Sequence, residues 1–134
     1  MGLGDRVALI GVGIDLVEVA DAARLLSRWG SRLLERVLTA DERAYVQGHE
    51  FPEKHLAVRL AAKEAVYKAL APLAGARAVG WRDIEVVRLA DGRPTVRLHG
   101  QAARLEERDG PFRISLSLSH TSETAGAVAV IEAS

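Results

Sequence analysis

The amino-acid sequence predicts an α+β fold in which an antiparallel sheet packs on one long helix. Segments with the period of a strand and segments with the period of a helix both occur. The strands come in hairpin-like pairs and do not alternate regularly with helices, which argues against a parallel α/β sheet. Residues 53–71 contain strong helix formers without Gly or Pro and are apolar nearly all round, as in a buried helix.

Length and composition limit the class of protein. The chain has 134 residues, so we expect a single domain spanning residues 1–134. Hydrophobic residues make up 49% of the sequence, which excludes intrinsic disorder, and the 18 basic and 18 acidic residues balance, which argues against nucleic acid as a partner. The absence of cysteine excludes disulfides, thiolate zinc sites and a cysteine nucleophile. No apolar run approaches the ~20 residues of a membrane span, and no signal peptide is recognisable, so we expect a cytoplasmic protein.

Residues 7–19 have the alternation of a strand. One face carries Ala8, Ile10, Val12, Ile14 and Leu16, and the other carries Val7, Leu9, Gly11, Gly13 and Asp15. Both faces begin apolar, which is typical of a strand covered on both sides. The glycines leave room on the face from which Asp15 projects. The Gly-x-Gly pattern is not a dinucleotide-binding loop, because Leu16 occupies the position of the third glycine.

Three short helices are expected next, at residues 20–29, 32–38 and from about 40 to 46. Ser31 can cap the second, and Thr39 with Glu42 forms a capping-box pattern before the third. Basic residues recur every four positions along the first two helices, at Arg24, Arg28, Arg32 and Arg36. They form either a solvated face or a docking surface for an acidic partner, since arginine is enriched in such contacts.

The second half of the chain supplies the remaining strands. A loop over residues 72–80 precedes an alternating strand at 81–89, and Asp91-Gly92 then gives a hairpin signal before a strand at 95–98. A short helix at 101–108 is followed by strands at 112–120 and 124–131. In the first of these two strands, strict alternation places His120 on the apolar side, at the end of the strand.

The long helix carries charges that its buried character does not explain. Arg59 and Lys63 stand among its leucines, and Glu64 and Lys68 stand at the edge of its alanine face. Burying an unpaired charge costs several kcal/mol or more. These groups therefore either form salt bridges, as in an exposed Glu64–Lys68 pair worth ~0.3–0.5 kcal/mol, or face a charged ligand.

Asp15, Glu64 and His120 stand out as polar groups in apolar surroundings. Two carboxylates in a chain without cysteine suit Mg²⁺, which commonly uses one or two carboxylates together with substrate phosphates. Lys68 lies one turn from Glu64, where an ammonium could reach a phosphate oxygen, and Arg59 offers a fork that fits phosphate. These residues fit phosphoryl transfer. A serine hydrolase is disfavoured by the lack of a Gly-x-Ser-x-Gly elbow, and a zinc site by the scattered histidines.

Several blocks of the sequence resemble one enzyme family. The blocks are Gly11-Val12-Gly13-Ile14-Asp15, residues 59–69 (Arg-Leu-Ala-Ala-Lys-Glu-Ala-Val-Tyr-Lys-Ala), Trp81-Arg82-Asp83-Ile84-Glu85-Val86, Gly92-Arg93-Pro94 and Ser117-Leu118-Ser119-His120. In this order they resemble the holo-acyl-carrier-protein synthases, the small class of 4′-phosphopantetheinyl transferases, over nearly the whole chain. Three positions depart from the family pattern: Asp21, Leu60 and residues 71–75.

The resemblance implies a 4′-phosphopantetheinyl transferase fold and an activity. Such enzymes move the phosphopantetheine arm of coenzyme A onto a serine of an apo acyl carrier protein with Mg²⁺ and release adenosine 3′,5′-bisphosphate. Asp15 and Glu64 match the metal ligands of the family, and Lys68 matches the lysine near the pyrophosphate. Arg59 and His120 match residues that meet the phosphates of the coenzyme.

The resemblance also implies partners. The family is usually a homotrimer with the active site between subunits, and its first helix typically docks the acidic carrier protein, here through Arg24, Arg28, Arg32 and Arg36. The base that takes the serine proton stays open, with a water polarised by Glu64 as one option. The sequence also leaves open whether the carrier serves fatty-acid or polyketide synthesis. Two alternatives remain, a coenzyme A or carrier-protein binding module without turnover and a metal-dependent phosphatase acting on nucleotides.

Overall fold

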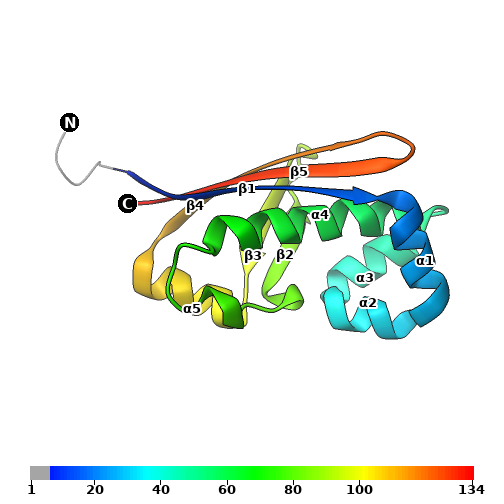
Figure 1. Ribbon diagram of the computed structural model, residues 1–134, viewed down its shortest axis with the longest axis horizontal. Coiled ribbons are helices and arrows are strands. Elements are labelled where there is room, and N and C mark those ends of the chain that lie inside the picture. The colour runs from blue at the N-terminus through cyan, green and yellow to red at the C-terminus, as the bar shows by residue number, and fades with distance from the viewer. Residues whose placement is uncertain (1–6) are drawn as a thin grey trace.

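The computed structural model describes residues 7–134 and has the expected α+β architecture (Figure 1). Its elements are β1 (Ala8–Glu18), α1 (Val19–Trp29), α2 (Ser31–Val37), α3 (Ala40–Gln47), α4 (Pro52–Leu70), the 3₁₀ helices η2 (Ala76–Ala78) and η3 (Trp81–Asp83), β2 (Ile84–Arg88), β3 (Pro94–Leu98), α5 (Gly100–Asp109), β4 (Phe112–His120) and β5 (Thr124–Ala133). An antiparallel sheet of order β1-β5-β4 lies across α4, and β2 pairs with β3 as a separate hairpin. Within this described part, no helix combines the length and apolar character needed to cross a membrane.

Helix α4 is the centre of the core. Pro52 stands in its first turn, where proline has no hydrogen bond to lose, and most of the side chains that follow are buried. One side of α4 packs against β1 and β5, and other sides contact α1, α3 and β2. The expectation of a long buried helix under an antiparallel sheet is confirmed.

Small residues allow the sheet to lie very close to α4. A Cβ atom built on Gly11 would stand 2.1 Å from the carbonyl oxygen of Ala69, and one built on Gly13 would stand 1.8 Å from that of Ala65. No side chain fits in these gaps, so the β1 backbone lies directly against the helix backbone. Asp15, two residues beyond Gly13 on the same face, is thereby held beside α4.

The other face of the sheet is not covered within residues 7–134, contrary to the expectation that β1 is buried on both sides. Val12, Ile14 and Leu16 are 56%, 62% and 70% exposed. The pairing of β1 with β5 also shifts register between Leu9 and Gly11, so Leu9 is exposed while Ile10 packs on the core. A bulge of this kind breaks strict alternation and leaves no mark in the hydrophobic pattern.

Local sequence patterns correctly predicted the start of α3 and the β2–β3 hairpin, and they were wrong at the start of α2 and at residues 81–83. Thr39 and Glu42 form the expected capping box at the start of α3, and β2 and β3 form the expected hairpin. Ser31 is not the N-cap of α2, because that position is held by Gly30 with a φ of 56°. Residues 81–83 form η3 rather than the start of a strand, since the Asp83 carboxylate accepts the backbone N–H of Gly80 and closes a tight turn.

The contact of Gly13 with α4 can be tested by one substitution. We expect Gly13→Ala to lower the free energy of unfolding by about 3 kcal/mol or more, because the added methyl group meets a helix backbone that cannot move aside. Urea denaturation followed by circular dichroism measures the change. Gly80→Ala is the control, since its Cβ would meet nothing closer than 4.0 Å, and equal stability of the two variants would contradict the close packing.

Candidate functional site

Asp15 and Lys68 meet where β1 crosses α4. The Nζ atom of Lys68 lies 3.0 Å from Oδ1 of Asp15 and also donates to the carbonyl oxygen of Ile14 at 2.9 Å. The side chain of Asp15 is 19% exposed and that of Lys68 is 49% exposed, so this ion pair lies at the edge of the solvent. The glycines of β1 make the contact possible, because they bring the strand within reach of a side chain on α4.

Glu64 lies one helical turn before Lys68 on the same side of α4. Among residues 7–134 its carboxylate forms no hydrogen bond and no ion pair, and Lys68 pairs with Asp15 instead. The Glu64–Lys68 surface pair that the spacing allowed is therefore not formed. Glu64 borders a cavity of about 290 Å³, lined also by Lys63, Tyr67, Val79, Gly80, Trp81 and Ile84.

The two carboxylates suit a hard cation in number and kind. Asp15 and Glu64 flank the same lysine, and each has oxygen atoms without a protein partner in the described chain. No three side chains of His, Cys, Asp or Glu within residues 7–134 gather to form a complete metal cage. A site with two carboxylates and open positions fits Mg²⁺, which keeps several ligand positions for water and substrate phosphate.

Arg59 is buried in the N-terminal half of α4. Its guanidinium lies 4.2 Å from the ring centroid of Tyr45 and donates to the carbonyl oxygen of His55 at 3.3 Å, while its Nε has no partner in the described chain. Burial lowers the pKa of Arg59, and the nearby carboxylate of Glu42 opposes this shift. Arg59 borders a cavity of about 330 Å³ whose lining combines the basic Arg88 and Arg97 with the acidic Asp41, Glu42 and Glu85.

His120 ends β4 and is exposed, so it does not have the apolar surroundings that the alternation suggested. Partial burial lowers the pKa of His55, and the neighbouring charges of His49, Arg59, Arg88 and His120 add to the effect. His120 and Arg59 thus both lower the pKa of His55.

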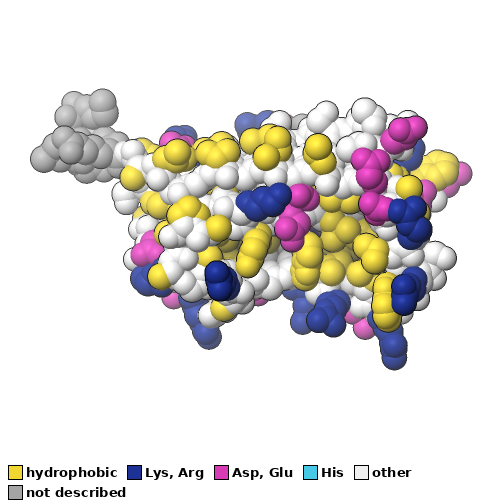
Figure 2. Space-filling view, in the orientation of Figure 1, with side chains coloured by type: hydrophobic (Ala, Val, Ile, Leu, Met, Phe, Trp, Pro, Cys, Tyr) yellow, Lys and Arg dark blue, Asp and Glu magenta, His cyan; other side chains and the backbone are white. Residues whose placement is uncertain are grey.

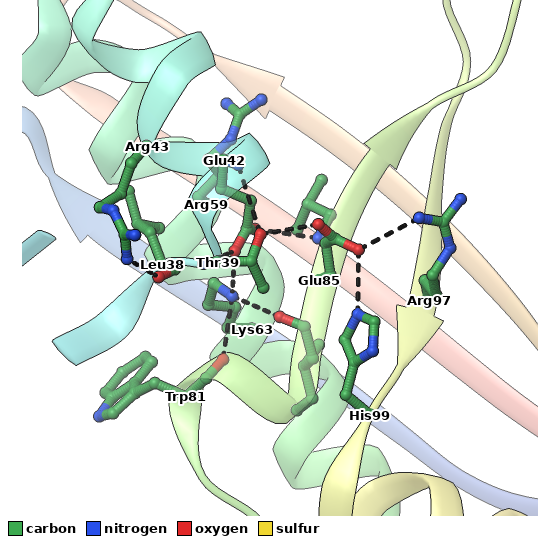
Figure 3. Close-up of polar contacts among 12 residues, drawn as sticks. Leu38, Thr39, Glu42, Arg43, Arg59, Lys63, Trp81, Glu85, Arg97 and His99 are labelled. Atoms are coloured by element: carbon green, nitrogen blue, oxygen red, sulfur yellow. Dashed lines mark hydrogen bonds and ion pairs between the residues drawn. The ribbon is translucent and has the colours of Figure 1, made fainter. Parts of the chain in front are cut away.

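Lys63 does not face a ligand. Its side chain is 1% exposed, and its ammonium pairs with the equally buried carboxylate of Glu42 at 2.8 Å (Figure 3). Glu42 was predicted only as a member of the capping box, and its Oε1 also accepts the N–H of Thr39. The sequence signal was present, since a lysine on a buried helix requires a partner, but nothing in the local pattern identified which acid supplies it.

The arginines of α1 and α2 form two pairs rather than one strip, because Gly30 bends the chain between the helices. Arg32 and Arg36 border a hollow of about 460 Å³ with Leu25, Trp29 and Leu33. Arg24 and Arg28 border a second hollow on the other side of Trp29, and Arg24 pairs with Asp21. Figure 2 shows basic side chains beside hydrophobic ones at the end of the molecule where α1 and α2 lie.

Comparison with known proteins gives the same family from sequence and from structure. The holo-[acyl-carrier-protein] synthase of Moorella thermoacetica is 43% identical over 126 residues, covering 94% of this chain and 96% of the relative. The acyl carrier protein synthase structure of Mycobacterium tuberculosis is 40% identical, with a TM-score of 0.72 over 95% of this chain and 100% of the other. A structure described as the Chronobacterium ammoniagenes ACPS–CoA complex is 33% identical, with a TM-score of 0.79 over 97% and 99% of the two chains.

The family pattern also covers both halves of the site. It matches residues 11–128, from Gly11, which lies against Ala69, to a position in β5 that follows His120. Asp15, Arg59, Glu64, Lys68 and His120 all fall within the match. On this coverage, the chain belongs to the 4′-phosphopantetheinyl transferase superfamily.

Proposed function

We propose that this chain, acting as one domain, transfers 4′-phosphopantetheine from coenzyme A to a serine of an apo acyl carrier protein and releases adenosine 3′,5′-bisphosphate. The observation that supports this most directly is the pairing of Asp15 with Lys68, one helical turn from Glu64, which itself borders a cavity on α4. The names of the similar enzymes and the coenzyme A complex of a similar structure support the same reaction. We place the reaction in the cytoplasm and in fatty acid biosynthesis, as part of lipid metabolism.

The acidic and the basic residues of the site have different proposed roles. Asp15 and Glu64 would hold Mg²⁺, which when bound offsets negative charge on the pyrophosphate of the coenzyme. Lys68, which is half exposed, can leave Asp15 for a phosphate oxygen and stabilise the departing adenosine 3′,5′-bisphosphate. Arg59 and His120 would bind other phosphates of the coenzyme. We propose that Glu64, whose carboxylate borders the cavity, polarises a water that takes the serine proton and passes a proton on to the carboxylate.

The first prediction from the proposed function concerns Glu64. We expect Glu64→Gln to fold as the parent does and to lose most of its transfer activity, with little recovery at high Mg²⁺, because the amide cannot supply the negative charge. Mass spectrometry of an apo carrier protein incubated with coenzyme A and Mg²⁺ measures the added phosphopantetheine mass. Glu107→Gln, an exposed carboxylate on α5, is the matched control. Full activity of Glu64→Gln would remove Glu64 from the mechanism.

The same assay separates the alternative functions. A binding module without turnover would retain coenzyme A or the carrier protein but add no mass to the carrier. A metal-dependent phosphatase would release products when no carrier is present. The proposed transferase instead requires the carrier serine as acceptor, so it yields adenosine 3′,5′-bisphosphate only together with modified carrier.

We propose that the acidic carrier protein docks on α1 and α2. All four arginines of these helices are exposed, and the hollow beside Arg32 and Arg36 offers apolar contacts at Leu25, Trp29 and Leu33. Positive charge would steer an acidic partner to this end of the molecule, and the apolar hollow would hold it.

The second prediction tests this surface. We expect the double substitution Arg32→Ala and Arg36→Ala to raise the KM for the carrier protein by roughly tenfold while kcat changes little, because charge at the rim of an interface mainly affects encounter. Steady-state kinetics at low and moderate salt measure the effect. The difference in KM between parent and variant should shrink at higher salt, because salt screens the attraction between the arginines of the parent and the acidic carrier. Arg104→Ala and Arg113→Ala, exposed elsewhere, are the controls. An unchanged KM would place the carrier on another surface.

We further propose that the protein is a homotrimer assembled through the outer face of the sheet. Figure 2 shows hydrophobic side chains along the sheet side of the molecule, where Val12, Ile14 and Leu16 of β1 and Val128 of β5 are exposed. Such a patch on a small protein marks an interaction surface. Leu16 follows Asp15 in β1 but projects from the opposite face of the strand, so further copies of the chain on this face would contact the strand that carries Asp15.

The third prediction is therefore a change in oligomeric state. We expect Val12→Asp to convert the assembly to monomers and to reduce transfer, because a charge in an apolar interface is costly to bury. Light scattering during size-exclusion chromatography measures the mass. Leu89→Asp replaces another exposed hydrophobic residue, on the β2–β3 hairpin, and should leave the mass unchanged. A trimeric Val12→Asp variant would contradict assembly through this face.

A further inference from the structure

The cavity beside Glu64 has two walls that come from different parts of the chain. One wall is α4, with Lys63, Glu64 and Tyr67. The other is the segment 79–84, which supplies Val79, Gly80, Trp81 and Ile84 and includes η3. The width of the cavity depends on what holds this segment against α4.

The ammonium of Lys63 spans the two walls. It donates to the carbonyl oxygen of Trp81 at 2.9 Å and to that of Ile84, and its third hydrogen goes to Oε1 of Glu42 at 2.8 Å. All three donors of the lysine are therefore used inside the protein. Among residues 7–134, these are the only hydrogen bonds that join the segment 79–84 to α4.

Glu42, the acidic partner of Lys63, is itself held by backbone N–H groups. Its Oε2 accepts the backbone N–H of Val86 at 3.0 Å, and its Oε1 accepts that of Thr39 at 2.9 Å (Figure 3). One buried ion pair thus connects the start of α3, the middle of α4, η3 and β2. Beyond it, Glu85 accepts the hydroxyl of Thr39 at 2.7 Å and continues the network toward the surface.

We propose that Lys63 is a positioning residue for the proposed transfer reaction. Its buried ammonium sets the separation between α4 and the segment 79–84, and this separation fixes the width of the cavity that Glu64 lines. This inference rests on the proposed function. Lys63 touches no substrate in this role; it acts through the wall that it holds.

Stability alone does not account for a charged pair at this place. Replacing a buried ion pair by apolar residues of similar volume is often neutral or stabilising, and α4 is already surrounded by apolar contacts. An apolar side chain at position 63 could fill the volume but could not donate to the carbonyls of Trp81 and Ile84. Those carbonyls would then turn to water, and the segment would move away from α4.

The test compares Lys63→Met with Val66→Ala, which removes buried side-chain volume one turn along the same helix without touching the ion pair. Both are assayed at a temperature where urea titration shows them fully folded. We expect Lys63→Met to lower kcat about tenfold or more, since a small misplacement of a reacting group is enough, while the KM for the carrier protein stays near that of the parent. Val66→Ala should keep its kcat.

A second measurement follows the wall itself and needs no activity. The chain has two tryptophans, so in a Trp29→Phe background the fluorescence reports on Trp81 alone. We expect acrylamide to quench Trp81 with a steeper dependence on concentration in Lys63→Met than in the parent or in Val66→Ala, because the freed segment admits more solvent.

Each outcome decides the matter. If Lys63→Met and Val66→Ala match in kcat and in quenching, Lys63 has only a structural role and the proposal is wrong. If Lys63→Met does not fold, the double variant Glu42→Leu, Lys63→Met removes the stranded carboxylate and takes its place, with the same two measurements. If the parent transfers nothing to any carrier, the proposed function fails, and the quenching comparison still decides whether Lys63 holds the wall.

Discussion

The whole arrangement depends on the close approach of the β1 backbone to α4. Gly11 and Gly13 lie against the carbonyls of Ala69 and Ala65, and no side chain separates strand from helix there. Since a strand side chain and a helix side chain can meet only where the two backbones converge, this contact is what brings Asp15 to Lys68. The small residues are thus needed for the site as much as for the core.

Helix α4 serves two chemical environments at once. Toward the sheet it presents alanines that face the alanines of β5, and this dry contact supplies much of the core. Toward α3 and η3 it presents Lys63, which is satisfied by an acid and two carbonyls. Glu64 stands next in the chain and has no such partner among the described residues. Two adjacent charges on one helix therefore have different surroundings: Lys63 is paired inside the protein, and Glu64 borders a cavity.

Sequence reasoning identified most elements because their signals are local, and it selected the candidate site residues from the family blocks. Alternation, a capping box and a hairpin turn each depend on residues close together in the chain, and family blocks marked Asp15, Glu64 and Lys68. The partner of Lys63 lies 21 positions away on another helix, and no local rule selects it. The bulge near Leu9 and the exposure of His120 were missed for a related reason. The first depends on how two strands pair, and the second depends on how far other elements pack over the end of β4.

The capping box of α3 has a consequence for how this chain can vary in evolution. Glu42 closes the first turn of a helix, as many acidic residues do, yet the same side chain neutralises a lysine in the interior and accepts the N–H of Val86. A substitution of the acid that is harmless at an ordinary helix cap would here leave the ammonium of Lys63 without its partner in the core. Positions 42 and 63 are therefore expected to covary among homologues, and a chimera that imports α3 from a relative must keep an acid at position 42.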